Sequence, residues 1–101
     1  MNIESTRDGE EIQFRLSDKM TFTDHQKFRD ILTEVSESGC SRCVIDLSRL
    51  DFIDSAGLGM LMIASDASGR ENWDLLVRHP RGVVRQVLEL ADFGKVVRLE
   101  L

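Results

Sequence analysis

The sequence predicts an α/β fold in one domain, residues 1–101, whose mixed sheet is opened by an N-terminal hairpin and packed against α-helices. Three observations predict it. The first twenty residues contain alternating apolar positions and an Asp-Gly turn signal. A stripe of apolar residues with helical spacing follows. Beyond that stripe, short apolar runs rich in β-branched residues alternate with segments of helical pattern, which is typical of strands joined by helices.

Two short strands form the predicted hairpin. Residues 3–6 make the first strand. Ile12, Phe14 and Leu16 alternate with polar residues in the second, which therefore has one buried face. Residues 8–9 join the strands, because glycine accepts the positive φ that a tight hairpin turn requires.

A first helix follows the hairpin. Thr23 and Gln26 have the spacing of a capping box, so we expect the helix to begin after Thr23. Gly39 is expected to end it, since glycine is common just after the last helical turn. The apolar stripe recurs at i, i+3, i+4 and i+7 and consists of Phe28, Ile31, Leu32 and Val35.

A central strand and helix organise the rest of the chain. Residues 43–47 predict a buried strand, and a short loop with acidic residues follows it. Asp54 or Ser55 can cap the free N–H groups of the next helix. Residues 56–64 are almost all apolar or glycine, so this helix is predicted to be buried on most sides. Gly69 is expected to end it.

The remaining segments continue the alternation. Residues 74–78 predict a strand, Pro80 the start of a helix, and residues 96–99 a last strand. Because the loops at the carboxyl ends of strands form the usual binding site of such folds, we expect the Ser55 loop to lie there. The last helix has a wide apolar face, which comprises Val83, Val84, Val87, Leu88, Leu90 and Ala91.

Composition and charge exclude several function classes. The hydrophobic share of 42% and the charged share of 31% are those of an ordinary globular protein. The formal net charge of −5, with no dominant basic patch, argues against a nucleic-acid partner. No apolar stretch approaches the ~20 residues of a membrane helix, and residues 1–7 lack the apolar core of a signal peptide. We therefore expect a cytoplasmic protein without direct membrane insertion.

Ser55 is the candidate functional residue because it stands where a helix begins. Helix N-termini favour negative charge, so the helix would tolerate a phosphate on Ser55, although Asp51 and Asp54 would oppose it as like charges. On the capping preference alone, a serine before a helix is more often a cap and nothing more. The local chemistry leaves both roles open.

The stretch Asp46-Leu47-Ser48, followed by Asp54-Ser55-Ala56-Gly57-Leu58-Gly59, resembles the STAS domain, a module shared by anti-sigma factor antagonists and sulfate transporters. The resemblance covers the whole chain. In the antagonists, the serine after the aspartate is the phosphorylation site, and it matches Ser55. The chain departs from the pattern at Leu16-Ser17-Asp18, where many members carry a glycine followed by an acidic residue.

The resemblance implies a regulatory binding module for bacterial signal transduction, without cofactor or enzymatic activity. The unphosphorylated form would dock an anti-sigma factor or switch kinase and so regulate transcription by partner switching. The kinase would use ATP to phosphorylate Ser55, and a phosphatase would reverse the change. A second hypothesis is a STAS subunit of an ABC-type membrane transport complex, in which Ser55 need never be phosphorylated. The expected partner-binding residues are Asp51, Asp54, Ser55, Ala56, Gly57 and Leu58.

Cys40 and Cys43 form a C-x-x-C pair, and a redox-sensing role for them is a third, weaker hypothesis. In redox proteins the first cysteine follows a strand and begins a helix, whereas here a helix precedes the pair and a strand follows it. The preferred interpretation is two cytosolic thiols. His25 and His79 do not complete a zinc site with them, because no second pair has ligand spacing.

Two further sites are not favoured. Asp46, Asp51 and Asp54 provide few convergent oxygens for magnesium, so we interpret them as polar loop residues and a helix cap. A hydrolase would need a histidine near Ser55, and the sequence places none there and has no G-x-S-x-G elbow.

Two expectations concern the helix after Ser55. Met60 and Met62 are predicted to fill the core rather than to line a partner groove. Bulk at Gly57 is expected to obstruct the docking surface more than it destabilises the fold.

Overall fold

The computed structural model describes residues 1–101 and contains a five-stranded sheet in the order β1-β2-β3-β4-β5. β1 pairs antiparallel with β2, and the other neighbouring strands pair in parallel. The predicted α/β fold with a hairpin-opened mixed sheet is confirmed. The strands are β1 (Asn2–Asp8), β2 (Glu11–Met20), β3 (Arg42–Ile53), β4 (Asp74–Arg78) and β5 (Arg98–Glu100), and the helices are α1 (His25–Ser38), α2 (Ser55–Glu71) and α3 (Gly82–Leu90).

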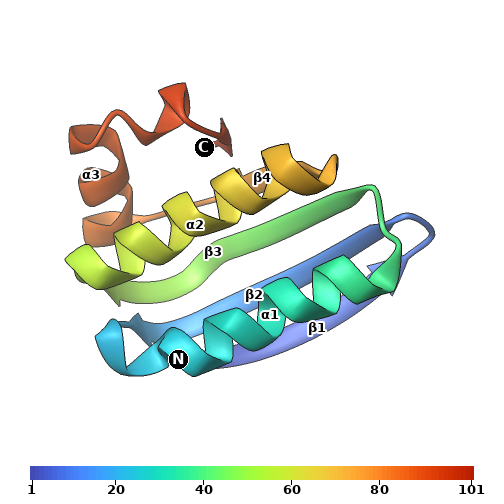
Figure 1. Cartoon of the computed structure of the whole chain (residues 1–101). Coiled ribbons are helices and arrows are strands. Elements are labelled where there is room, and N and C mark those ends of the chain that lie inside the picture. The colour runs from blue at the N-terminus through green and yellow to red at the C-terminus, as the bar shows by residue number, and fades with distance from the viewer.

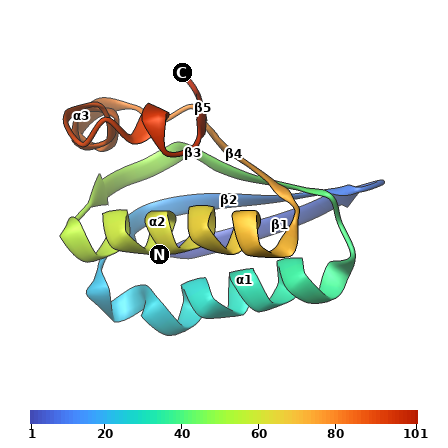
Figure 2. The same cartoon turned by 45° about the horizontal axis from the view of Figure 1, so that its top comes forward.

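Helices lie on both sides of the sheet. α1 and α2 run side by side over one face, and α3 is on the opposite side of the strands (Figures 1 and 2). The apolar side chains of the sheet and the helices form one core, and their burial holds α2 in place. Its members include Ile12, Phe14, Leu16, Ile45, Leu61, Ala64, Val77 and Val84.

α1 has the predicted stripe but a different start. The expected capping box of Thr23 and Gln26 is wrong, because the Gln26 amide reaches forward and donates a hydrogen bond to Asp30 Oδ1 at 3.0 Å. The chain instead enters the helix through a short 3-10 turn, η1 (Phe22–Asp24). Gly39 ends α1 in the left-handed conformation, as predicted. The buried stripe consists of Phe28, Ile31 and Val35.

β3 is longer than predicted. It continues from residue 47 to Ile53, so Asp51 lies in a strand and not in a loop. This extension is stable because β2 also continues, and Met20 pairs with Ile53. β4 pairs only with residues 42–46 of β3. The carboxyl end of β3 therefore extends beyond β4 and leads directly to the start of α2.

β2 is irregular where the sequence departs from the STAS pattern. The pairing register of β2 with β3 shifts between Asp18 and Lys19, and Asp18 has a φ of 72°. This left-handed conformation favours glycine, and aspartate is among the residues that tolerate it best. Asp18 therefore adopts the left-handed conformation at this register shift, although no glycine is present.

α2 extends past the residue that was expected to end it. Gly69 lies inside the helix, which continues to Glu71. Asn72 is the residue that caps the end, with a φ of 59° and its N–H donating to the Ser68 carbonyl. Glycine is the most usual residue at such a cap and asparagine is the next, which is why the sequence pattern favoured Gly69.

α2 is buried on one side only, contrary to the prediction. The core position of Met60 is confirmed, whereas that of Met62 is wrong, because 47% of Met62 is exposed. Ile63 beside it is exposed as well. A helix that packs on one face of a sheet buries one stripe, and an apolar composition alone does not bury the other. The buried residues of α2 are Gly57, Met60, Leu61, Ala64 and Ala67.

The C-terminal segments differ from the prediction mainly in their limits. β4 spans the predicted residues, and α3 begins two residues after Pro80. A second 3-10 turn, η2 (Phe93–Lys95), precedes the last strand, which begins at Arg98 and not at Val96 as predicted. On α3, Val84 and Leu88 are buried, and the rest of the predicted apolar face is not fully buried. None of the helices combines the length and the hydrophobicity needed to cross a bilayer.

Candidate functional site at the start of helix α2

The carboxyl ends of β2, β3 and β4 meet at one edge of the molecule, and Ser55 lies at that edge. The Asp54 N–H donates to the Met20 carbonyl at 3.2 Å, which ties the end of β3 to the end of β2. Arg81, just before α3, donates to Asp51 Oδ1 at 3.0 Å. The edge predicted from the strand pattern is therefore assembled from three strand ends.

Ser55 is the first residue of α2, a helix of 17 residues, and it is exposed. The cap is its neighbour, because Asp54 Oδ1 accepts a hydrogen bond from the Gly57 N–H at 2.8 Å. Of the two capping candidates, the structure thus selects Asp54. The Ser55 hydroxyl is left at the surface on a backbone that the helix fixes.

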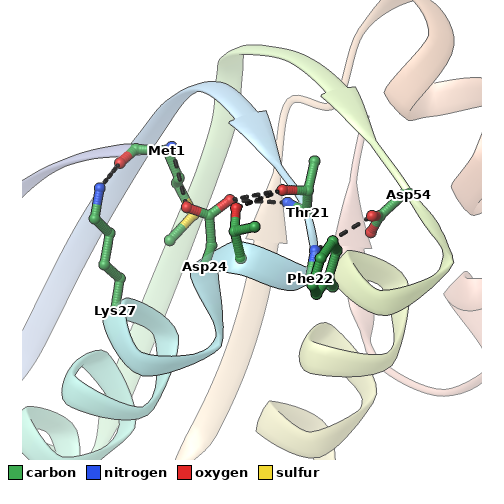
Figure 3. Close-up of polar contacts among 7 residues, drawn as sticks. Met1, Thr21, Phe22, Asp24, Lys27 and Asp54 are labelled. Carbon is green, nitrogen blue, oxygen red and sulfur yellow. Dashed lines mark hydrogen bonds and ion pairs between the residues drawn. The ribbon is translucent and has the colours of Figure 1, made fainter.

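Asp54 makes a second contact that the sequence did not indicate. Its other oxygen, Oδ2, accepts a hydrogen bond from the Phe22 N–H at 3.2 Å (Figure 3). One carboxylate therefore joins the 3-10 turn η1 to the first turn of α2, although the two segments are 32 residues apart. Both bonds use N–H groups as donors to a charged acceptor, which makes them stronger than neutral hydrogen bonds.

Gly57 allows the close approach of α2 to the strand ends. A Cβ atom built on it would lie 2.6 Å from the Met20 carbonyl oxygen and 2.7 Å from Ile53 Cγ1. Gly57 is buried, whereas Ala56 and Leu58 beside it are half-buried. The expectation that bulk at Gly57 acts mainly at the docking surface is therefore corrected: a side chain there would strike the backbone of β2.

A buried ion pair supports η1 from the other side. The Met1 ammonium lies 3.2 Å from Asp24 Oδ1, and Asp24 Oδ2 accepts from the Thr21 N–H at 2.8 Å (Figure 3). Lys27 donates to the Met1 carbonyl at 2.9 Å. Burial opposes the ionisation of Asp24, but the Thr21 N–H and the ammonium outweigh it, so the pKa of Asp24 is lowered. In the sequence, only the spacing of Thr21 and Asp24 indicates any of these contacts.

The three aspartates weighed as a magnesium site have separate partners. Asp46 accepts from the Ser48 N–H at 2.8 Å and faces the Arg15 guanidinium, while Asp51 pairs with Arg81 and Asp54 caps α2. Burial opposes the ionisation of Asp46, but those two partners lower its pKa overall. No group of three His, Cys, Asp or Glu side chains is arranged to hold a metal ion.

The cysteines and histidines are not gathered into one site. Cys40 and Cys43 are buried and free, and burial raises the pKa of Cys43 to about 12. The Cys43 thiol is therefore protonated at neutral pH and is a poor nucleophile. His25 is exposed at the start of α1, and His79 Nε2 lies 3.2 Å from Glu100 Oε1.

Comparison with known proteins identifies the family. Residues 3–99 match the family described as "Mlab, STAS domain". The chain belongs to the STAS domain family. It is also 30% identical, over 92 residues, to a STAS-domain containing protein of Pseudomonas aeruginosa (strain UCBPP-PA14), a match that covers 91% of this chain and 90% of that protein.

Solved structures of low sequence identity share the STAS fold. A putative anti-sigma factor antagonist from Thermotoga maritima superposes with a TM-score of 0.89 at 16% identity, over 98% of this chain and 86% of that one. The anti-sigma factor antagonist SpoIIAA, in its unphosphorylated form, gives 0.75 at 16% identity, over 99% and 87%. Its phosphorylated form, from Bacillus, gives 0.74 at 16% identity, over 97% and 90%.

A transporter protein shares the fold as well. A sulfate transporter family protein from Wolinella succinogenes superposes with a TM-score of 0.78 at 14% identity, over 90% of this chain and 76% of that one. Identities this low establish the fold alone. The fold is thus shared by an anti-sigma factor antagonist and by a sulfate transporter family protein.

Proposed function

We propose that this protein is an anti-sigma factor antagonist, a binding module that docks an anti-sigma factor or switch kinase while Ser55 is unphosphorylated. In this proposal Asp51, Asp54, Ala56 and Leu58 surround the contact, and the kinase and a phosphatase control the phosphate on Ser55. The protein is a phosphate acceptor and not an enzyme, and it acts in the cytoplasm.

The observation that carries the proposal is the exposed Ser55 hydroxyl at the first residue of a rigid, capped helix. A kinase needs an accessible hydroxyl, and a partner that discriminates phosphate needs that hydroxyl at a fixed place. The likeness to SpoIIAA, whose structures include a phosphorylated form, supports the same reading.

The expected switch is electrostatic and acts at the interface. A phosphate adds about −1.5 to −2 charges at neutral pH beside the carboxylates of Asp51 and Asp54. The start of α2 offsets part of this repulsion in the free protein, typically by less than ~1 kcal/mol at an exposed site. In a complex, the phosphate would be a buried and unpaired charge, which costs several kcal/mol.

Phosphorylation in the source organism tests the proposal. Mass spectrometry of the purified protein is expected to find phosphate on Ser55 and none on Ser5, an exposed serine of β1 that serves as the matched control. Ser55→Ala should abolish the modification. A protein that carries phosphate elsewhere, or one whose labelling survives Ser55→Ala, would contradict the proposal.

A second candidate is a STAS subunit of a membrane transport complex, which the fold shared with the sulfate transporter family protein supports. This role predicts stable co-purification with a transporter ATPase in the membrane fraction. It also predicts that Ser55→Asp leaves that association unchanged, whereas the antagonist role predicts that Ser55→Asp abolishes binding of the anti-sigma factor or switch kinase.

A further inference from the structure

Phe22 is a large aromatic residue in an unusual place: it lies in the short turn η1, and 66% of it is exposed. Exposure means that the ring contributes little to the core. An exposed aromatic side chain on a constrained backbone is the kind of residue that dominates protein interfaces, because it buries a large area and loses little entropy on binding.

Hydrogen bonds hold the backbone at Phe22, at Asp24 and at the preceding Thr21. The Thr21 N–H donates to Asp24 Oδ2 at 2.8 Å, and the Asp24 N–H donates back to the Thr21 carbonyl at 2.9 Å. Between them, the Phe22 N–H donates to Asp54 Oδ2 at 3.2 Å. Asp24 is itself fixed by the buried Met1 ammonium. These bonds fix the point from which the ring projects.

The same carboxylate that holds Phe22 also caps α2 beside Ser55. Asp54 accepts from Phe22 through one oxygen and from Gly57 through the other. Figure 3 shows Phe22 beside the first turn of α2. Asp54 therefore ties the backbone of Phe22 to the helix start beside Ser55.

The stripe of α2 that starts at Ser55 adds apolar surface to this site. Positions three or four apart share one helix face, so Gly59 and Met62 follow Ser55 along it. Met62 is half-exposed. One turn later the stripe becomes charged at Asp66, which pairs with Arg70 at 3.7 Å. An apolar centre with a charged rim is the usual anatomy of a protein interface.

We propose that Phe22 is the aromatic anchor of the surface around Ser55 and inserts into an apolar pocket of the protein partner that docks there. The inference depends on the proposed function for the identity of that partner. The nearness of Phe22 to Ser55 supports the choice of the same partner for both. A standard interface covers about 800 Å² on each side. Phe22 and the residue preceding Ser55 are joined by one hydrogen bond, so a partner that covers Ser55 reaches η1.

The test places a photo-crosslinking side chain at single positions of the full chain in the source organism. The probes are Phe22→p-benzoylphenylalanine, Met62→p-benzoylphenylalanine and, as control, Leu90→p-benzoylphenylalanine. Leu90 is 88% exposed and lies at the end of α3, on the other side of the sheet. Each probe is also made in a chain that carries Ser55→Asp. Any crosslinked protein is identified by mass spectrometry, purified and titrated against Phe22→Ala and Leu90→Ala.

The inference expects an adduct from position 22 that Ser55→Asp abolishes, and none from position 90. Phe22→Ala should then weaken affinity at least about thirtyfold, the loss typical of an interface anchor, with Leu90→Ala within threefold. Circular dichroism should show both alanine variants folded, since both side chains are exposed.

Other results separate the inference from the proposed function. An adduct from position 62 without one from position 22 would refute the role of Phe22 as an anchor, and so would an affinity of Phe22→Ala within threefold of the parent. Neither result would contradict the control of docking by Ser55. An adduct from Phe22 that survives Ser55→Asp would support the anchor and refute the switch. The lack of any adduct from both positions would overturn both.

Discussion

The two hydrogen bonds accepted by Asp54 make Asp54→Ala the most informative stability variant. Loss of the N-cap bond to Gly57 costs about 1 kcal/mol. Loss of the bond from Phe22 to a charged acceptor costs about 1.5 kcal/mol, the lower end of the range because the turn is exposed. We therefore expect the free energy of unfolding to fall by about 2–3 kcal/mol, which corresponds to a drop of about 10–20 °C in Tm for a domain of this size.

Three further variants at this edge sharpen the test. Asp54→Asn keeps one acceptor oxygen, so it should satisfy one of the two N–H groups and lose about half as much stability. Asp51→Ala removes only an exposed ion pair with Arg81 and should cost less than ~1 kcal/mol. Ser55→Ala should cost less than ~0.5 kcal/mol, because Ser55 is not the cap.

Urea unfolding followed by circular dichroism measures all four variants, with unchanged m-values as the check on two-state behaviour. If Asp54→Ala were as stable as Asp51→Ala, Asp54 would not join η1 to α2, and the positioning of Phe22 would lose its basis. If Ser55→Ala were the least stable variant, the cap would have been assigned to the wrong residue.

Three other predictions follow from contacts near the site. Gly57→Ala should destabilise the protein by about 1–3 kcal/mol, because the new Cβ clashes with the Met20 carbonyl. Gly59→Ala, whose Cβ meets no atom within 4 Å, should stabilise it by about 0.5–1 kcal/mol, and equal Tm shifts for the two variants would refute the packing argument. Because the pKa of Asp24 is lowered, its ion pair stabilises the fold at pH values above its pKa in the unfolded chain, near ~3.9, and this stability is lost as the pH falls below that value. Asp24→Asn should flatten that part of a Tm–pH curve, and a curve parallel to that of the parent would contradict the role of Asp24. Cys43, with its raised pKa of about 12 and no exposure, should resist iodoacetamide at pH 8 until urea unfolds the protein, and rapid native labelling by mass spectrometry would revive the redox hypothesis.

Periodicity was sufficient for the elements whose buried faces are regular. Alternation in β2 predicted buried residues correctly, and the stripe of α1 predicted three core residues and the partly buried Leu32, because burial on one face imposes the period of the backbone. The length of β3 could not be predicted in this way. Its last residues form a strand only because β2 extends beside them, and that pairing links positions about 33 residues apart, as in Met20 and Ile53.

The candidate site was predicted in part. The sequence placed Ser55 at a helix start, and the structure agrees, but it could not decide whether Asp54 or Ser55 is the cap. The contact of Asp54 with Phe22 was missed, since nothing local signals a bond over 32 residues. Met62 was wrongly assigned to the core because apolar composition does not reveal which stripe of a helix faces the sheet. Gly57 was expected to act at the docking surface, whereas the structure places the position of its missing side chain against the Met20 carbonyl of β2.

The central claim is that a charge on Ser55 controls docking and leaves the fold intact. Calorimetric titration of the purified partner against the parent, Ser55→Ala and Ser55→Asp tests it most directly, with Ser5→Asp as a charge-matched control on exposed β1. We predict that Ser55→Ala and Ser5→Asp bind like the parent, that Ser55→Asp loses affinity by about a hundredfold or more, and that Tm changes by only a few degrees. Binding of Ser55→Asp as tight as that of the parent would contradict the switch and would favour the transport-subunit role.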